Sequence, residues 1–260
     1  MKTLITCVAI LFSICSFAQP GSWKQVGASG GWKGTTNMTM INGEIFSVDK
    51  SGALYKTIAA TGAWKKLGSA YNTAFIFAGN GVLYTIENSG SLYVINRTDG
   101  SWKQIGVAGA WKGTIAATVY NGKLYTAEKS GALYLTDLAT GRWVQIGKPE
   151  FGNTWNLWSA NNKLYSIEKS GTMYEINPTD GSWKQVGASG AWNGTLTGVV
   201  MNNAFYSVSK NGALYVTDLP TGNYKKIGSD AFAATVFMGA GASKLYTIES
   251  SGTLYEVNVD

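Results

Sequence analysis

The stretch GSWKQVGASG occurs twice without change, at Gly21–Gly30 and again at Gly181–Gly190. One copy lies near the start of the chain and the other deep inside it. A chain that opens on a segment it uses again internally contains a repeat. The length and content of that repeat determine the fold, so we establish the period first.

Two sequence ladders fix this period. An aromatic residue before a KQVG-like segment recurs 38 to 41 residues apart, at Trp23, Trp64, Trp102, Trp143, Trp183 and Tyr224. An SGxLY-like element also occurs six times, at Ser51-Gly52, Ser89-Gly90, Ser130-Gly131, Ser170-Gly171, Asn211-Gly212 and Ser251-Gly252. The chain therefore contains six repeats of about 40 residues.

Each repeat predicts four short strands, which we call a to d in chain order. In residues 112–147, GTIAATVY, KLYTAEK, ALYLTD and RWVQIG are separated by turn residues. The a–b turn is Asn-Gly in three repeats and Asn-Asn in two. Asn-Gly supplies the two positive φ angles that a tight type I′ hairpin requires. Four-stranded antiparallel repeats of this length are typical of β-propellers. We predict an all-β, six-bladed β-propeller with four-stranded antiparallel blades.

The opening repetition has its explanation in how the ring closes. The sixth repeat ends at Leu254–Asp260, before any strand d, and Pro20–Gly27 supplies the missing segment from the other end of the chain. We expect this N-terminal strand to complete the sixth blade and to cover an otherwise exposed sheet edge.

The first residues predict export from a bacterial cell. Met1–Ala18 has a basic start, an apolar run and a small-x-small end, which is typical of a signal peptide cut after Ala18. The apolar run is too short to span a bilayer, so we expect no membrane insertion. The expected division is residues 1–18 as signal peptide and 19–260 as propeller, secreted or periplasmic.

Composition excludes several classes of function. The chain has no histidine, and its two cysteines, Cys7 and Cys15, lie in the predicted signal peptide. We therefore expect no thiolate metal site, no Cys or His nucleophile and no cofactor. Without Lys2, 20 basic and 15 acidic residues leave a net charge of +5, with no Lys/Arg run of five. Nucleic-acid binding is not expected.

A second period makes alternate repeats alike. The first, third and fifth repeats carry GGWKGT, GAWKGT and GAWNGT in the d–a loop, whose tryptophans are Trp32, Trp111 and Trp192. The ring should thus have pseudo-threefold symmetry. The d–a loops and b–c turns belong to one face of the ring, because strands a and c run opposite to b and d. The b–c turns there carry Asp49, Glu87, Glu128, Glu168 and Glu249.

These eight residues are the candidate ligand-binding set. An indole beside a carboxylate and glycine-flanked backbone suits a sugar, which has an apolar face and hydroxyls. Trp32, Trp111 and Trp192 occur only in alternate blades, which favours a ligand role over a role in building every blade. The alternative is that they pack beneath the adjacent blade. The strand-d aromatic residues are predicted to fill the gap between neighbouring blades.

With its GxLYxI strands, Asn-Gly hairpins and GxW..IG closing strands, the chain resembles propeller lectins of the tachylectin and tectonin type. The resemblance extends over the whole chain after Ala18. It implies a propeller that binds glycans at sites repeated around the ring, and it assigns no individual residue.

Three functions follow as hypotheses. The first is a secreted lectin-like protein with up to three equivalent, weak glycan sites on the d–a/b–c face. The second is a protein-binding scaffold. The third is a glycosidase, which would need two of the face carboxylates roughly 5–10 Å apart. We expect no catalytic residues and no enzymatic activity. The glycan and the oligomeric state stay open.

Overall fold

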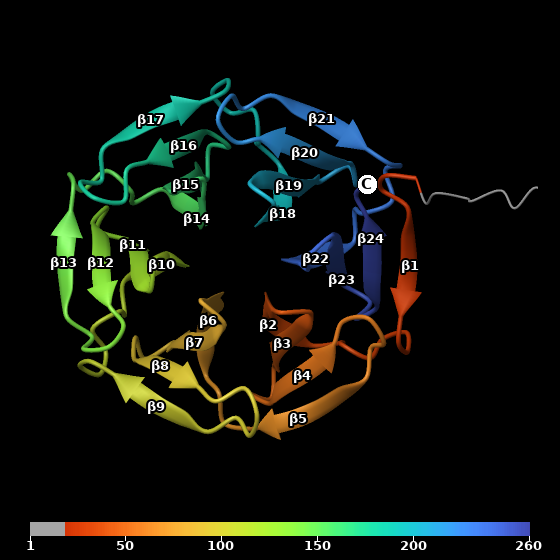
Figure 1. The fold of residues 1–260 in the computed structure, drawn as a ribbon, viewed down its shortest axis with the longest axis horizontal. Coiled ribbons are helices and arrows are strands. Elements are labelled where there is room, and N and C mark those ends of the chain that lie inside the picture. Colours follow the sequence, from red (N-terminus) through yellow and green to blue (C-terminus); the bar gives the residue numbers. More distant parts are fainter. Residues whose placement is uncertain (1–18) are drawn as a thin grey trace, which may run out of the picture.

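A computed structural model describes residues 19–260. These residues form six four-stranded antiparallel sheets arranged as a closed ring, which confirms the predicted six-bladed β-propeller (Figure 1). The predicted signal peptide and its cleavage site after Ala18 lie outside the described residues. No helix among the described residues is long and apolar enough to cross a membrane.

The strands of each blade run from the centre of the ring to its rim in the order a to d. Blade 1 contains β2 (Thr35–Ile41), β3 (Glu44–Asp49), β4 (Leu54–Ile58) and β5 (Trp64–Gly68). Blade 2 contains β6 (Thr73–Gly79), β7 (Val82–Glu87), β8 (Leu92–Ile95) and β9 (Trp102–Ile105). Blade 3 contains β10 (Thr114–Tyr120), β11 (Lys123–Glu128), β12 (Leu133–Asp137) and β13 (Trp143–Ile146).

The other three blades repeat this pattern. Blade 4 contains β14 (Thr154–Ala160), β15 (Lys163–Glu168), β16 (Met173–Ile176) and β17 (Trp183–Val186). Blade 5 contains β18 (Thr195–Met201), β19 (Ala204–Ser209), β20 (Leu214–Asp218) and β21 (Tyr224–Ile227). Blade 6 contains β22 (Thr235–Ala240), β23 (Lys244–Glu249), β24 (Leu254–Asn258) and, from the other end of the chain, β1 (Trp23–Val26).

The a–b hairpins have the geometry that the Asn-Gly pairs predict. Asn42 and Gly43 have φ angles of 50° and 77°. Asn161 and Asn162, which replace Asn-Gly in blade 4, have φ angles of 49° and 58°. Two consecutive positive φ angles match the right-handed twist of the flanking strands. The turn chemistry therefore sets the register of strands a and b.

The ring closes through β1. This strand pairs antiparallel with β24, and Trp23 and Val26 lie opposite Val257 and Leu254. Blade 6 has the strand order β22-β23-β24-β1. The predicted closure is confirmed, and the first described strand covers the edge that β24 would otherwise expose.

The hydrophobic core is divided among the junctions between blades. The described residues contain six buried clusters, and each cluster combines side chains of two neighbouring blades. At the junction of blades 6 and 1, for example, Val26 and Ile248 pack with Ile45. Because the blades radiate from the centre, neighbouring sheets diverge toward the rim (Figure 1). The b strands, such as β3, β7 and β11, are buried on both faces, whereas the a strands are mostly half-buried and the d strands mostly exposed.

Candidate functional site

The loop tryptophans are core residues, which is the placement that the packing alternative predicts. Trp32, Trp111 and Trp192 have exposed fractions of only 2–6%. Each belongs to the buried cluster at one blade junction. The equivalent position in the other three blades also holds a buried aromatic residue, namely Tyr71, Phe151 or Phe232. An aromatic side chain thus builds all six junctions, and the packing alternative is confirmed.

A partner on strand c explains why tryptophan occurs in alternate blades. The Trp32 indole donates a hydrogen bond to Thr57 Oγ1 at 3.1 Å, and Trp192 donates to Thr217 Oγ1 at 3.3 Å. Trp111 makes the same bond in blade 3. The blades that lack this tryptophan have an aliphatic residue in place of the threonine, at Ile95, Ile176 and Val257. Threonine and tryptophan therefore occur in the same blades, because the threonine hydroxyl accepts the hydrogen bond of the buried indole N–H.

The strand-d aromatic residues are exposed, which corrects the prediction that they fill the gap between blades. These side chains, which we call the rim aromatics, have exposed fractions of 46–61% and are Trp23, Trp64, Trp102, Trp143, Trp183 and Tyr224. Each packs edge-on against a tyrosine of strand c, as in the 4.9 Å contact between Trp102 and Tyr93. The diverging blades leave the remaining surface of each ring in solvent.

The d–a loops and b–c turns share one face, as predicted. The Trp32 amide donates to the carbonyl of Gly252, in the b–c turn of the preceding blade. Gly171 has a φ of 83°, and a Cβ there would lie 2.2 Å from the Asn193 amide nitrogen. The SG turns therefore need glycine, because the next loop lies directly against them.

The face carboxylates make local contacts. Asp49 Oδ1 accepts hydrogen bonds from the Ser51 amide at 2.8 Å and from the Ala53 amide at 3.0 Å, and Oδ2 accepts one from the Tyr55 hydroxyl at 3.3 Å. Burial opposes ionisation of Asp49, but these bonds and one from the Ser51 hydroxyl outweigh it and lower its pKa. Asp49 is therefore a charged acceptor at neutral pH.

Glu128 has a different environment. Its exposed fraction is 8%, and Oε1 accepts a hydrogen bond from the Thr114 hydroxyl at 2.8 Å. Burial raises the pKa of Glu128, against the opposing effect of the Thr114 bond. Glu87, Glu168 and Glu249 are half-buried in their turns. The sequence thus placed these carboxylates on one face but did not distinguish their environments.

The rim aromatics of blades 1, 4 and 5 each border a cleft. In each case the d–a loop that leads into the same blade forms another wall of the cleft. In blade 1 the cleft has a volume of about 130 Å³, and Trp64, Tyr55 and Asp49 line it. In blade 4 it has a volume of only about 50 Å³. There Glu150 Oε2 accepts a hydrogen bond of 2.8 Å from the Trp183 indole.

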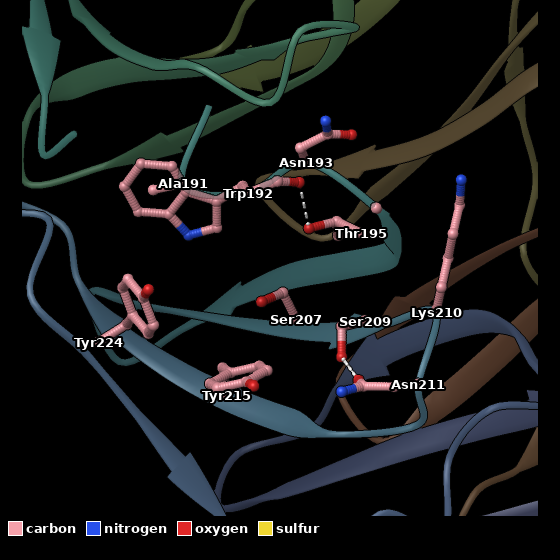
Figure 2. A pocket seen from close by; sticks show the side chains of 11 residues that line it. Ala191, Trp192, Asn193, Thr195, Ser207, Ser209, Lys210, Asn211, Tyr215 and Tyr224 are labelled. Atoms are coloured by element: carbon pink, nitrogen blue, oxygen red, sulfur yellow. Dashed lines mark hydrogen bonds between the residues drawn. The ribbon is translucent and has the colours of Figure 1, made fainter. Parts of the chain in front are cut away.

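Blade 5 has a cleft of about 430 Å³ at the same place. Figure 2 shows Trp192, Tyr215 and Tyr224 around it, with Ser209 and Asn211 on the b–c turn and Lys210 at one side. The sequence analysis missed this site. Its sequence signal is that the b–c turn of the fifth repeat has Ser209 where the other five have a carboxylate.

Metal binding has no support among residues 19–260, where no group of three His, Cys, Asp or Glu side chains is placed to hold an ion. The polar groups that the clefts offer are hydroxyls, amides, single carboxylates and lysines. These groups bind ligands by hydrogen bonding and charge.

Comparisons with known proteins identify the architecture. A scan against protein-family models finds no match, and no curated protein matches. Among solved structures, a protein of unknown function from Bacteroides thetaiotaomicron has a TM-score of 0.72 at 13% identity, covering 94% of this chain and 77% of that one. YCF48 bound to D1 peptide has a TM-score of 0.61 at 13% identity, covering 87% and 78%.

BamB from Moraxella catarrhalis is a third similar structure, with a TM-score of 0.54 at 14% identity, covering 86% of this chain and 85% of that one. At these identities the similarity shows the fold alone. The comparisons give no specific support to the resemblance to tachylectin-type and tectonin-type lectins.

Proposed function

We propose that this chain is a non-enzymatic binding propeller that takes a protein or peptide partner on its rim aromatics and the clefts beside them. The observation that carries the proposal is the set of six aromatic side chains, one per blade, that stay 46–61% exposed around the whole circumference. A regular series of exposed aromatic rings offers a partner repeated anchor points.

The chemistry of the rim suits a polypeptide. Tryptophan and tyrosine are the residues most enriched at the energetic centres of protein interfaces. The next residue of strand d is a lysine in five of the six blades, at Lys24, Lys65, Lys103, Lys184 and Lys225. A band of alternating aromatic and cationic side chains offers apolar contact and charge over a length that an extended chain can follow. YCF48, which shares the fold, was solved with a bound peptide.

The absence of catalysis is part of the proposal. Asp49 is held by the turn that contains it, and Glu128 is buried against Thr114. The face carboxylates come from five different blades. These contacts support structural and binding roles for the carboxylates, in preference to the paired acid and base of a glycosidase.

Carbohydrate is the second candidate, because of the blade 1 cleft. The half-exposed Trp64 ring lies beside Asp49, whose lowered pKa keeps it ionised, and the hydroxyl of Tyr55 lines the same cleft. A ring, a charged acceptor and hydroxyls are what a sugar needs. Trp32 also lines this cleft, but with an exposed fraction of 6% it offers little surface for stacking.

The place of action is proposed from sequence alone. Residues 1–18 have the pattern of a signal peptide, so the partner would lie in the periplasm or outside the cell. N-terminal sequencing of the protein recovered from cell fractions tests this. A start at Gln19 in an extracytoplasmic fraction is expected, and retention of Met1 in the cytoplasm would contradict export.

The experiment is a parallel probing of a random 12-residue peptide array and a glycan array with residues 19–260. The test variant changes Trp64, Trp102 and Trp143 to alanine, which removes the rim aromatics of three adjacent blades. The matched control changes three exposed aliphatic residues outside the rim, Ile58, Val107 and Val236, to alanine.

We expect saturable binding to a subset of peptides, reduced by about tenfold or more in the rim variant and unchanged in the control. Both variants should stay folded, because the removed rings are half-exposed, although the rim variant loses its edge-on contacts with Tyr55, Tyr93 and Tyr134. Binding to glycans alone would overturn the polypeptide partner, and peptide binding that survives the rim variant would overturn the rim as the site.

A further inference from the structure

We infer that the cleft of blade 5 binds a carboxylate of the partner, namely the side chain of an aspartate or glutamate in a polypeptide. The inference rests on the proposed function and assigns one position of the ring a specific ligand group. It comes from comparing the residues at equivalent positions of the six blades.

Blade 5 departs from the pattern at three positions that line one cavity. Ser209 stands where the other blades have Asp49, Glu87, Glu128, Glu168 and Glu249. Asn211 replaces the serine of the SG turn, and Tyr224 replaces the rim tryptophan. All three line the cleft of about 430 Å³, whereas the blade 1 cleft, which keeps the carboxylate and the tryptophan, has about 130 Å³. The departures together open space.

The blade 5 cleft contains a free hydrogen-bond donor. In blade 1 the Tyr55 hydroxyl donates to Asp49 Oδ2 at 3.3 Å. Tyr215 is the equivalent tyrosine in blade 5 and lines the cleft, and its hydroxyl has no hydrogen-bond partner within residues 19–260. Asn211 Oδ1 accepts hydrogen bonds from the Ala213 amide at 3.3 Å and from the Ser209 hydroxyl. Asn211 thus replaces the contacts that Asp49 makes within its own turn, but not the contact of Asp49 with the tyrosine.

The charge around the cleft favours an anion. No carboxylate lines it. Lys210 lines it, is exposed, and forms no ion pair within the described residues (Figure 2). Lys226, opposite Tyr215 in the sheet, is paired with Asp230 at 2.7 Å. An incoming carboxylate thus finds one free cation and one free hydroxyl where the other blades hold their own carboxylate.

The walls favour an amino-acid side chain over a uronic acid. Trp192, Tyr215 and Tyr224 enclose the cleft with aromatic surface, and the Trp192 and Tyr224 rings are 6.2 Å apart between centroids. Aromatic surface on several sides suits the methylenes and flanking backbone of an acidic residue. Tyr224 is also one of the rim aromatics, so the cleft is continuous with the proposed polypeptide site.

The test is an NMR titration of residues 19–260 carrying ¹³C-labelled tyrosine. The probes are the capped tripeptides Ac-Gly-Glu-Gly-NH₂ and Ac-Gly-Gln-Gly-NH₂, and glucuronate. The variant Ser209→Glu restores the carboxylate of the other blades, and Ser209→Gln adds the same bulk without charge. Lys210→Gln removes the free cation. Lys129→Gln, at the equivalent position of blade 3 beside Glu128, is its matched control.

We expect the Glu tripeptide to shift the Tyr215 and Tyr224 resonances saturably, with affinity at least about tenfold above that of the Gln tripeptide. Ser209→Glu should abolish the shifts and Ser209→Gln should weaken them less. Lys210→Gln should cost about two- to fivefold in affinity, since the lysine is exposed, and Lys129→Gln should have no effect.

Equal affinity for the Glu and Gln tripeptides would overturn the carboxylate assignment. Binding of glucuronate without the Glu tripeptide would overturn the polypeptide source, and no binding of any probe would overturn the site. Failure of this inference can be distinguished from failure of the proposed function. The proposed function is tested by array binding with the rim variant, which changes blades 1 to 3 and uses none of these probes.

Discussion

The hydrogen bond between Trp32 and Thr57 gives the sharpest test of how the blades are joined. Replacing Thr57 by valine keeps the shape of the side chain and removes the acceptor of the 3.1 Å bond. Thr57 has an exposed fraction of 0% and Trp32 one of 6%, and both line the blade 1 cleft, where an entering water would offset part of the loss. A buried N–H without a partner costs about 1–3 kcal/mol.

Each kcal/mol shifts the melting temperature of a domain of this size by about 2–4 °C. Thr57→Val should therefore lower it by about 2–12 °C, measured by calorimetry. The chain offers a matched control in Thr126, which is also 0% exposed but whose Oγ1 has no hydrogen-bond partner. Thr126→Val removes a buried hydroxyl that forms no hydrogen bond. We therefore expect the free energy of unfolding to stay equal or to rise by up to about 1 kcal/mol.

The double variant Trp32→Phe/Thr57→Ile copies the residues that blade 4 has at these positions, Phe151 and Ile176. It removes donor and acceptor together and fills part of the space. The two changes should be less costly together than the sum of the singles, with a coupling of about 1 kcal/mol. Additive costs, or equal destabilisation by Thr57→Val and Thr126→Val, would refute the reasoning.

Three further predictions concern the ring as a whole. Deleting Gly21–Gly27 should leave an aggregating or loosely folded protein, because β24 loses its partner strand; an unchanged melting temperature would reject the closure. Glu128→Gln should stabilise the protein at neutral pH. Burial raises the pKa of Glu128, so the folded state loses stability as the pH rises from the unfolded pKa through the folded one. Below pH 4.5 the carboxyl is protonated in both states, and the stability gained by Glu128→Gln should vanish there; a gain that persisted would contradict this account. Gly171→Ala should destabilise the junction of blades 4 and 5 by several kcal/mol in chemical denaturation, since its Cβ would meet the Asn193 amide at 2.2 Å in a positive-φ turn, and wild-type stability would refute this contact.

The fold could be predicted from the sequence because each of its determinants is local and repeated. The aromatic ladder gives the blade count, the Asn-Gly pairs give the hairpins, and the duplicated GSWKQVG segment gives the closing strand. All three are properties of short segments, and each repeats often enough to exclude chance. The structure confirms each of them.

The burial of the two tryptophan sets could not be predicted in the same way, and the prediction that the strand-d aromatic residues fill the gap between blades was wrong. A period places a residue along a strand but does not say how far the next blade lies from it. At the rim the blades diverge, so Trp102 on the outermost strand stays half-exposed. Near the loops they converge, and small neighbours such as Gly30 and Gly31 let Trp32 fold inward.

One sequence signal could have identified the buried set. Thr57, Thr136 and Thr217 occur on strand c only in the repeats that have the loop tryptophan, and Ile95, Ile176 and Val257 replace them in the others. A polar residue that accompanies an indole at a fixed offset indicates a hydrogen bond between them. The carboxylate environments carry no such signal, because the burial of Glu128 depends on the neighbouring loop.

The most direct test of the account is the behaviour of the ten indole N–H groups in one NMR experiment. Their exchange rates with solvent are measured for residues 19–260, alone and with an array-selected peptide. The account predicts slow exchange for the buried, hydrogen-bonded indoles of Trp32, Trp111 and Trp192, with or without peptide. It predicts fast exchange at the rim, with peptide-induced shifts there. Fast exchange and peptide-induced shifts at the loop tryptophans, with an unchanged rim, would contradict it.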